Sequence, residues 1–138
     1  HIGTDPYYGF VHTIISTAAN EAEGKVAPGL LREDDAVVYG DAGYLKMDKY
    51  VTDGIDREYK INLQRGTFKR HYGDDLAWAY EKEIEKRKSS VRCKVEYVFH
   101  IVKDIFHWRK TRYKGIHKND CYAHLLFASA NLYMLAMG

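Results

Sequence analysis

The spacing of apolar and polar positions differs between the two halves of the chain. The first half carries short apolar or β-branched runs bounded by turn residues, a pattern that predicts strands. The predicted strands span residues 1–5, 10–18, 36–39 and 59–63. The third run is apolar throughout, which predicts a buried strand. Between the strands, the pattern predicts an irregular helix from Asn20 to about Leu31 and a second helix from Tyr44 to about Asp53.

In the second half of the chain, apolar residues recur at helical spacing. This spacing predicts a long helix that begins at Asp74 or Asp75 and ends near His107. A last helix is predicted for Cys121–Met137, with Asn119 or Asp120 at its start. This helix is apolar nearly all round, which favours a buried position. Basic loops are predicted at residues 66–73 and 108–115, the second of them rich in aromatic residues.

The order of predicted elements is β-β-α-β-α-β-α-α, which indicates an α/β fold with one hairpin followed by βαβ crossovers. The chain has 138 residues, enough for one domain with a real core, so residues 1–138 are expected to form a single domain.

The predicted long helix carries two stripes. The apolar stripe consists of Val91, Val95, Val98, Val102 and Ile105. The charged stripe consists of Arg92, Glu96 and Lys103 and lies about a third of a turn from the apolar stripe. It places one carboxylate between two cations, beside the apolar face. A salt-bridge ladder facing water is the ordinary interpretation of such a pattern. A functional site is the alternative.

Composition excludes several classes of protein. No window approaches 18 uninterrupted apolar residues and no leader opens the chain, so neither a membrane span nor secretion is expected. Cys93 and Cys121 lack the spacing of a zinc site, and we expect both to be thiols of a cytoplasmic protein. Residues 1–58 carry 5 basic and 11 acidic side chains, whereas residues 81–118 carry 12 and 5. The second block can therefore serve as a phosphate-binding surface.

Asp41 follows the strand predicted at residues 36–39 and is flanked by glycines. The carboxyl ends of strands in α/β sheets are where ligands bind, so Asp41 is a candidate site residue. Capping of the next helix is the alternative. Asp41 and Glu96 together offer the oxygen ligands that hard divalent cations prefer, and phosphoryl transfer at DNA commonly uses two such ions about 4 Å apart.

Several segments now show a resemblance to a family. The chain resembles the C-terminal part of the DDE transposases of bacterial insertion sequences, in the large groups numbered four and five. Arg92, Glu96 and Lys103 reproduce the family's R-x3-E-x6-K signature, and the segment with Asp41 is similar to the one that carries the second catalytic Asp. The other matching segments are residues 1–5, 17–20, 112–119 and 125–132.

The resemblance implies a ribonuclease-H-like mixed sheet flanked by helices, and DNA cleavage and strand transfer with two Mg²⁺ or Mn²⁺ ions. It implies that Asp41 and Glu96 are catalytic metal ligands. The expected DNA-binding residues are Arg92, Lys103, Arg109, Arg112 and Lys114. Double-stranded DNA is the expected partner, with a homodimer in the intact enzyme and a location at the bacterial nucleoid in the cytoplasm.

Two departures from the family pattern bear on activity. Ser89 stands where the family has a Tyr, three residues before the signature Arg. The chain also begins at His1, after the family's first strand with its catalytic Asp, and Asp5 corresponds to a non-catalytic position. We therefore expect an N-terminally truncated fragment that does not cut DNA alone. A non-catalytic DNA-binding remnant and a nuclease of the same fold are the alternatives.

Overall fold

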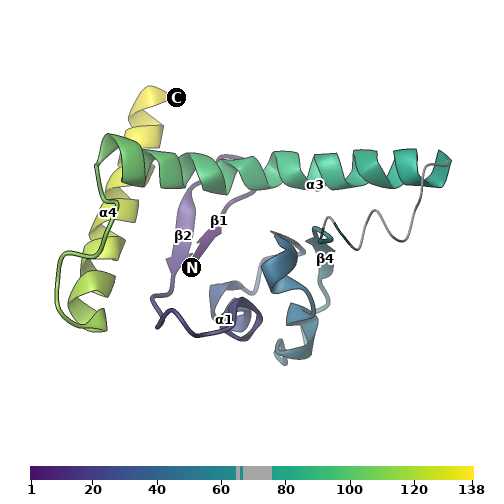
Figure 1. Ribbon diagram of the computed structural model, residues 1–138, viewed down its shortest axis with the longest axis horizontal. Coiled ribbons are helices and arrows are strands. Elements are labelled where there is room, and N and C mark those ends of the chain that lie inside the picture. The colour runs from purple at the N-terminus through teal and green to yellow at the C-terminus, as the bar shows by residue number, and fades with distance from the viewer. Residues whose placement is uncertain (65, 67–75) are drawn as a thin grey trace. The chain divides into compact units, whose positions relative to one another are not determined.

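The computed structural model describes residues 1–64, 66 and 76–138 (Figure 1). The chain divides into two compact units, which are described one at a time. The first unit comprises residues 1–21, 29–31 and 93–138, and the second comprises residues 22–28 and 32–92. The long helix α3, Leu76–His100, contributes its final turns to the first unit and the rest to the second.

The first unit opens with an antiparallel hairpin of β1, Ile2–Thr4, and β2, Val11–Ile14. Ile2 pairs with Ile14, but the register shifts between Gly3 and Thr4. The end of α3 then passes into a five-residue π-helix, η3 (Ile101–Ile105). The last element is α4, Ile116–Met137.

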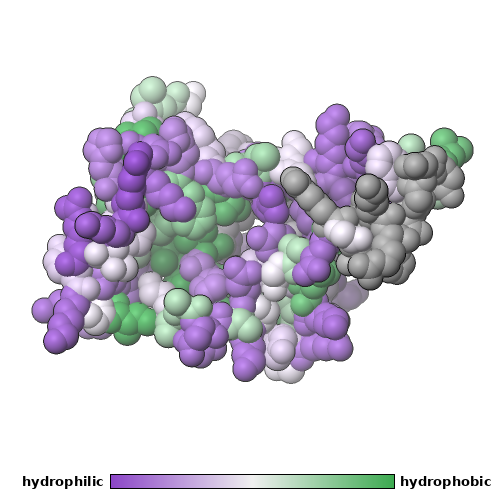
Figure 2. Space-filling view, viewed as in Figure 1, coloured by the Kyte–Doolittle hydropathy of each residue, from purple (hydrophilic) through white to green (hydrophobic). Residues whose placement is uncertain are grey.

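The core of the first unit forms where α3, η3, α4 and β2 meet. Val98 and Val102 of the predicted apolar stripe are fully buried, and so is Ile101, which the stripe did not include. Burying such side chains contributes roughly 1.5–3 kcal/mol each. Ile105, the last member of the predicted stripe, is 38% exposed. The other buried members of the cluster are Val11, Ala123, Leu126, Phe127 and Ala130. Hydrophilic side chains cover much of the face shown in Figure 2, with apolar groups visible between them.

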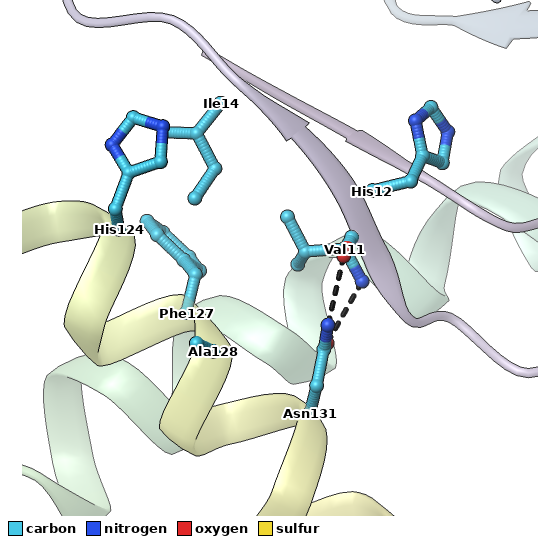
Figure 3. A pocket seen from close by; sticks show the side chains of 7 residues that line it. All are labelled: Val11, His12, Ile14, His124, Phe127, Ala128 and Asn131. Carbon is cyan, nitrogen blue, oxygen red and sulfur yellow. Dashed lines mark hydrogen bonds between the residues drawn. The ribbon is translucent and has the colours of Figure 1, made fainter.

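A side chain of α4 joins the helix to the hairpin within this unit. Asn131 Oδ1 accepts a hydrogen bond from Val11 N at 2.9 Å, and its Nδ2 donates to Val11 O at 2.8 Å. Figure 3 shows both bonds at one side of a pocket that β2 and α4 line together.

The second unit is built on a parallel pair of strands. β3, Val37–Gly40, lies beside β4, Glu58–Ile61, with Val37 opposite Glu58. Helix α1, Glu23–Leu30, precedes them and contains Pro28, which agrees with the irregular helix predicted there. Within this unit Glu85 of α3 accepts hydrogen bonds from Leu63 N at 3.0 Å and from Asn62 Nδ2 at 2.8 Å, both just beyond β4.

The four strands lie close to where the sequence placed them, but two other predictions are wrong. The segment from Tyr44 to Asp53 is not one helix: it forms two 3₁₀ turns, Ala42–Tyr44 (η1) and Met47–Lys49 (η2). Lys46 between them has φ 67°, a left-handed conformation that ends a helix. The strand β3 is not buried either, because Val37 is 37% exposed and β4 is the only strand paired with it in the described part of the chain.

The last helix also departs from its prediction. It begins at Ile116, after Gly115 with φ 90°, and not at Cys121 with an Asn119 or Asp120 cap. It is buried on one side only, because α3, η3 and β2 cover a single face. Leu125, Leu132 and Leu135 remain 62–69% exposed on the other side.

The long helix keeps its predicted character but ends early. Its α-helical part stops at His100, and the wider π turns of η3 carry the chain to Ile105. The predicted start at Asp74 or Asp75 and most of the basic loop at 66–73 lie outside the described residues. The single ribonuclease-H-like mixed sheet stays a prediction; the described strands form two two-stranded sheets.

Candidate functional site

Asp41 lies immediately beyond β3, at the carboxyl end of a parallel strand, as the sequence predicts. Its backbone is extended, and its Oδ1 accepts a hydrogen bond from Gly43 N at 2.9 Å, which makes Asp41 the N-cap of η1. Asp41 therefore caps a short 3₁₀ turn, and not the helix from Tyr44 to Asp53 that the capping interpretation assumed. The cap engages Oδ1, and no hydrogen bond to Oδ2 is found among the described residues.

Two further groups of the second unit gather around Asp41. A Cβ placed on Gly43 would collide with Glu23 Oε2 and would lie 3.1 Å from Asp41 Oδ1, so the two carboxylates are close to each other. Tyr44 lies beside them. Burial, together with the negative charges of Glu23 and Asp41, raises the pKa of the Tyr44 phenol to about 12. Asp41 thus stands in a negative environment made by residues 18 positions apart in sequence.

This donor set fits a hard divalent cation in kind but is incomplete in number. Carboxylate oxygens are the ligands that Mg²⁺ and Mn²⁺ prefer. No group of three His, Cys, Asp or Glu side chains that could hold a metal occurs within the described residues. A metal at Asp41 would need ligands beyond Asp41 and Glu23.

Glu96 lies on α3, on the exposed side of the helix. Arg92, four residues earlier, lies on the same helix, and Lys103, seven residues later, lies in the π-helix η3. Lys103 Nζ lies 5.0 Å from the centre of the Phe99 ring, a cation–π contact that positions the ammonium group. Arg92 and Glu96 therefore lie on the predicted helix, whereas Lys103 lies in the π-helix that follows it.

Asp41 and Glu96 belong to different units, Asp41 to the second and Glu96 to the first. Their convergence on one metal cluster stays a prediction.

Arg109 follows η3 and is already engaged. Its Nη2 donates to Asp104 Oδ1 at 3.1 Å, while His100 Nδ1 lies 2.9 Å from the other oxygen of Asp104. The hydrogen bond from His100 and the charge of Arg109 hold the pKa of the Asp104 carboxyl below its usual range. Arg109 is therefore a poorer free phosphate ligand than its sequence context indicates.

Arg112 and Lys114 lie in the exposed segment between η3 and α4. Neither forms an ion pair with another residue in the described ranges. Both can bind a phosphate without first breaking an ion pair with a carboxylate.

Two residues near these sites have no signal in the sequence. Glu23, at the start of α1, lies close to Asp41, and the spacing of the two residues in the sequence does not indicate this. Asn119, expected to start a helix, instead bonds back to the basic segment before α4. Both belong to contacts that a one-dimensional pattern does not report.

The described residues include no helix with the length and apolar character that a membrane crossing requires. No solved structure gives a significant match to the chain. The family model described as "Transposase DDE domain" matches residues 1–132, which is nearly the whole chain. The matched range includes the strand-end Asp41 and the helical Glu96 with its two cations, and the chain therefore belongs to the transposase DDE domain family.

Proposed function

We propose that the chain is the catalytic part of a transposase of a bacterial insertion sequence, in the groups numbered four and five, with a ribonuclease-H-like fold. Its reaction is cleavage of DNA and joining of the cut strand to a target. The observation that carries the proposal is the family match over residues 1–132, which contains Asp41 at a strand end and Glu96 on an exposed helix face.

In this proposal Asp41 and Glu96 are the metal-binding carboxylates. A pair of Mg²⁺ or Mn²⁺ ions supplies activation of the attacking hydroxyl and stabilisation of the leaving oxygen. The hydrogen bond from Gly43 N holds one oxygen of the Asp41 carboxylate and so orients the side chain. The Glu23 carboxylate adds negative charge on the Asp41 side, next to the neutral phenol of Tyr44, and this charge favours cation binding over binding of a bare phosphate.

The cations of the first unit and of α3 position the DNA. Arg92 precedes Glu96 by four residues on α3, and Lys103 follows it by seven residues in η3. Both are placed in this proposal at phosphates next to the scissile bond. The segment after η3 adds further contacts through Arg109, Arg112 and Lys114. The partners are double-stranded DNA at the element's ends and at its target, a second copy of the protein, and the nucleoid of the bacterial cytoplasm.

We further propose that these residues do not cut DNA alone. Two ions at a working separation need three or more carboxylates, and Asp41 and Glu96 supply two.

Nicking of supercoiled plasmid in Mn²⁺ tests this assignment. We expect none from the chain alone, and nicking once an N-terminal extension carries the family's first strand with its Asp. In the extended chain, Asp41→Asn or Glu96→Gln should abolish nicking, while the exposed Glu83→Gln should not. Nicking that survives both substitutions would remove Asp41 and Glu96 from the mechanism. Nicking by the chain alone that is lost in Asp5→Asn would assign the third ligand to Asp5.

A second experiment measures the convergence of the two carboxylates. They should lie within about 10 Å of each other, since paired ions sit about 4 Å apart. In a Cys93→Ser, Cys121→Ser background, the Asp41→Cys, Glu96→Cys double variant should be joined by a short bifunctional thiol reagent, and an Asp48→Cys, Glu96→Cys pair should react less. Equal reaction would count against a shared site.

A non-catalytic DNA-binding role is the second candidate, favoured by the exposed cations around Arg112. Duplex binding by the extended chain without nicking in either metal would support this role over catalysis. Nicking without joining of a labelled 3′-end would favour a nuclease.

A further inference from the structure

The segment between η3 and α4 concentrates positive charge in the first unit. It carries four cations in six residues, namely Arg109, Lys110, Arg112 and Lys114, and all four are exposed. We call residues 109–114 the basic loop. In Figure 1 it is the turn that joins the end of α3 to α4, and Figure 2 shows mostly hydrophilic side chains at that end of the molecule.

Aromatic side chains close the basic loop at both ends. The Trp108 ring meets the Tyr122 ring edge-on, with centroids 6.1 Å apart, and the Tyr113 ring meets the same Tyr122 at 5.5 Å. Tyr122 belongs to α4 and packs against the core of the first unit. One core-anchored ring therefore holds the residue before the loop and a residue near its end, which restricts the conformations of the residues between them.

Asn119 fixes the same end of the loop through its backbone. Its Nδ2 donates to Tyr113 O and to Gly115 O, both at 2.6 Å, and its Oδ1 accepts from Tyr113 N at 3.2 Å. One side chain thus satisfies three backbone groups on either side of Lys114.

Most of the cations of the basic loop are available to bind an anionic ligand. Arg109 is engaged by Asp104. Lys110, Arg112 and Lys114 form no ion pair with any residue that the structure describes. Three cations with no acidic partner, on a loop closed at both ends, form a surface whose natural ligand is a row of phosphates.

We propose that the basic loop is a preformed clamp for consecutive phosphates of the DNA backbone, and that Asn119 is the positioning residue that holds it in its binding conformation. The inference rests on the proposed function, because it assigns the DNA of that reaction as the ligand. A loop ordered before binding loses less conformational entropy when it binds. Asn119 therefore raises affinity without touching DNA.

The salt dependence of DNA affinity distinguishes the loss of a positioning residue from the loss of a cation that contacts phosphate. Loss of a phosphate contact flattens the dependence of log affinity on log salt by about 0.9 per contact. Loss of order leaves all the cations in place, so affinity falls while the salt slope stays close to its original value.

The test is equilibrium binding of the full chain to a random-sequence DNA duplex over a range of salt, by fluorescence anisotropy. Asn119→Ala should weaken binding by on the order of tenfold with an unchanged slope, since one or two side chains lose their order. Arg112→Ala should weaken binding and flatten the slope by about 0.9. The exposed His117→Ala, two residues before Asn119, is the matched control and should change neither.

A second variant and a second measurement distinguish loss of order in the basic loop from unfolding of the Asn119→Ala chain. Tyr113→Leu removes the contact with Tyr122 at a 47% exposed position and should repeat the Asn119→Ala signature. Hydrogen exchange at the Tyr113 amide should be faster in Asn119→Ala, with helix content by circular dichroism unchanged.

Wild-type affinity in both Asn119→Ala and Tyr113→Leu would overturn the positioning role. An unchanged slope in Arg112→Ala would overturn the loop as a phosphate surface, even if duplex binding through other cations supports the proposed function. Absence of any duplex binding by the wild-type chain at low salt would contradict both the clamp and the proposed function.

Discussion

Asn131 and Val11 are joined by two hydrogen bonds across 120 positions of sequence. The amide side chain of Asn131 accepts from the backbone N–H of Val11 and donates to its C=O, so it acts as a neighbouring strand would. Val11 lies at the register shift of the hairpin, where Thr4 is its partner on β1. Asn131 therefore satisfies backbone groups on the outer side of β2 and connects the last helix to the first hairpin.

The first prediction concerns this connection. Asn131→Ala leaves the N–H and C=O of nearly buried Val11 without partners, and should lower the free energy of unfolding by about 1–3 kcal/mol. Urea denaturation followed by circular dichroism measures it. Ser129→Ala, at a half-buried position of the same helix whose hydroxyl donates to Leu125 O one turn earlier, is the control and should stay within about 0.5 kcal/mol. An Asn131→Ala loss no larger than that of the control would mean that water replaces both bonds.

The second prediction concerns Glu85 in the second unit. Burial acts to raise the pKa of Glu85, but hydrogen bonds from Lys88, Asn62 and Leu63 N outweigh it, and the pKa is lowered overall. A lowered carboxyl pKa contributes stability above the unfolded value of about 4.3, and the contribution is lost as pH falls below it.

Glu85→Gln should therefore cost about 1.5–3 kcal/mol at neutral pH and less in acid, as charge-assisted hydrogen bonds are lost. Denaturant midpoints at neutral and acid pH check this, with exposed Glu83→Gln as the matched control. A Glu85→Gln penalty that is equal at both pH values would contradict the ionised network.

The third prediction concerns Tyr44, whose pKa stands at about 12. The raised value holds the phenol neutral in the folded state, so its stabilisation is complete below about pH 10 and is lost as pH rises beyond it. Glu23→Gln removes one nearby negative charge and should lower this pKa, while burial keeps it above the ordinary value. The tyrosinate absorbance difference between each chain and its Tyr44→Phe derivative gives the pKa. An unchanged value in Glu23→Gln would show that Glu23 is too distant to act on Tyr44.

The fourth prediction concerns Asp104, which occupies Arg109 through a 3.1 Å ion pair. Asp104→Asn frees the guanidinium and removes a negative charge, so duplex affinity should rise and the salt slope should steepen by up to about 0.9. Asp120→Asn removes a charge next to His124 without freeing an arginine. It should raise affinity less and leave the slope unchanged. Equal slopes in the two variants would mean that Arg109 does not reach DNA.

Much of the local structure follows from the sequence. The β-branched runs around Val11 and Val38 form strands because side chains of that shape suit an extended backbone. The spacing of Val98 and Val102 requires a helix with one apolar face, and both residues are fully buried. The position of Asp41 at a strand end and the helical stripe of Glu96 follow in the same way, since each depends on residues that are neighbours in the chain.

Tertiary structure alone decided the contacts that join distant segments. The sequence around Glu23 does not indicate its approach to Asp41, and an Asn three residues after Gly-Ile is not a signal for the three bonds of Asn119. The exposed side of α4 was likewise unpredictable, because an apolar helix is buried only where other elements cover it, and here they cover the side of Phe127 and not that of Leu132. Periodicity reports the local path of the backbone, whereas burial and long-range pairing depend on how complete elements pack, and that packing is decided by the sum of many weak contacts along the whole chain.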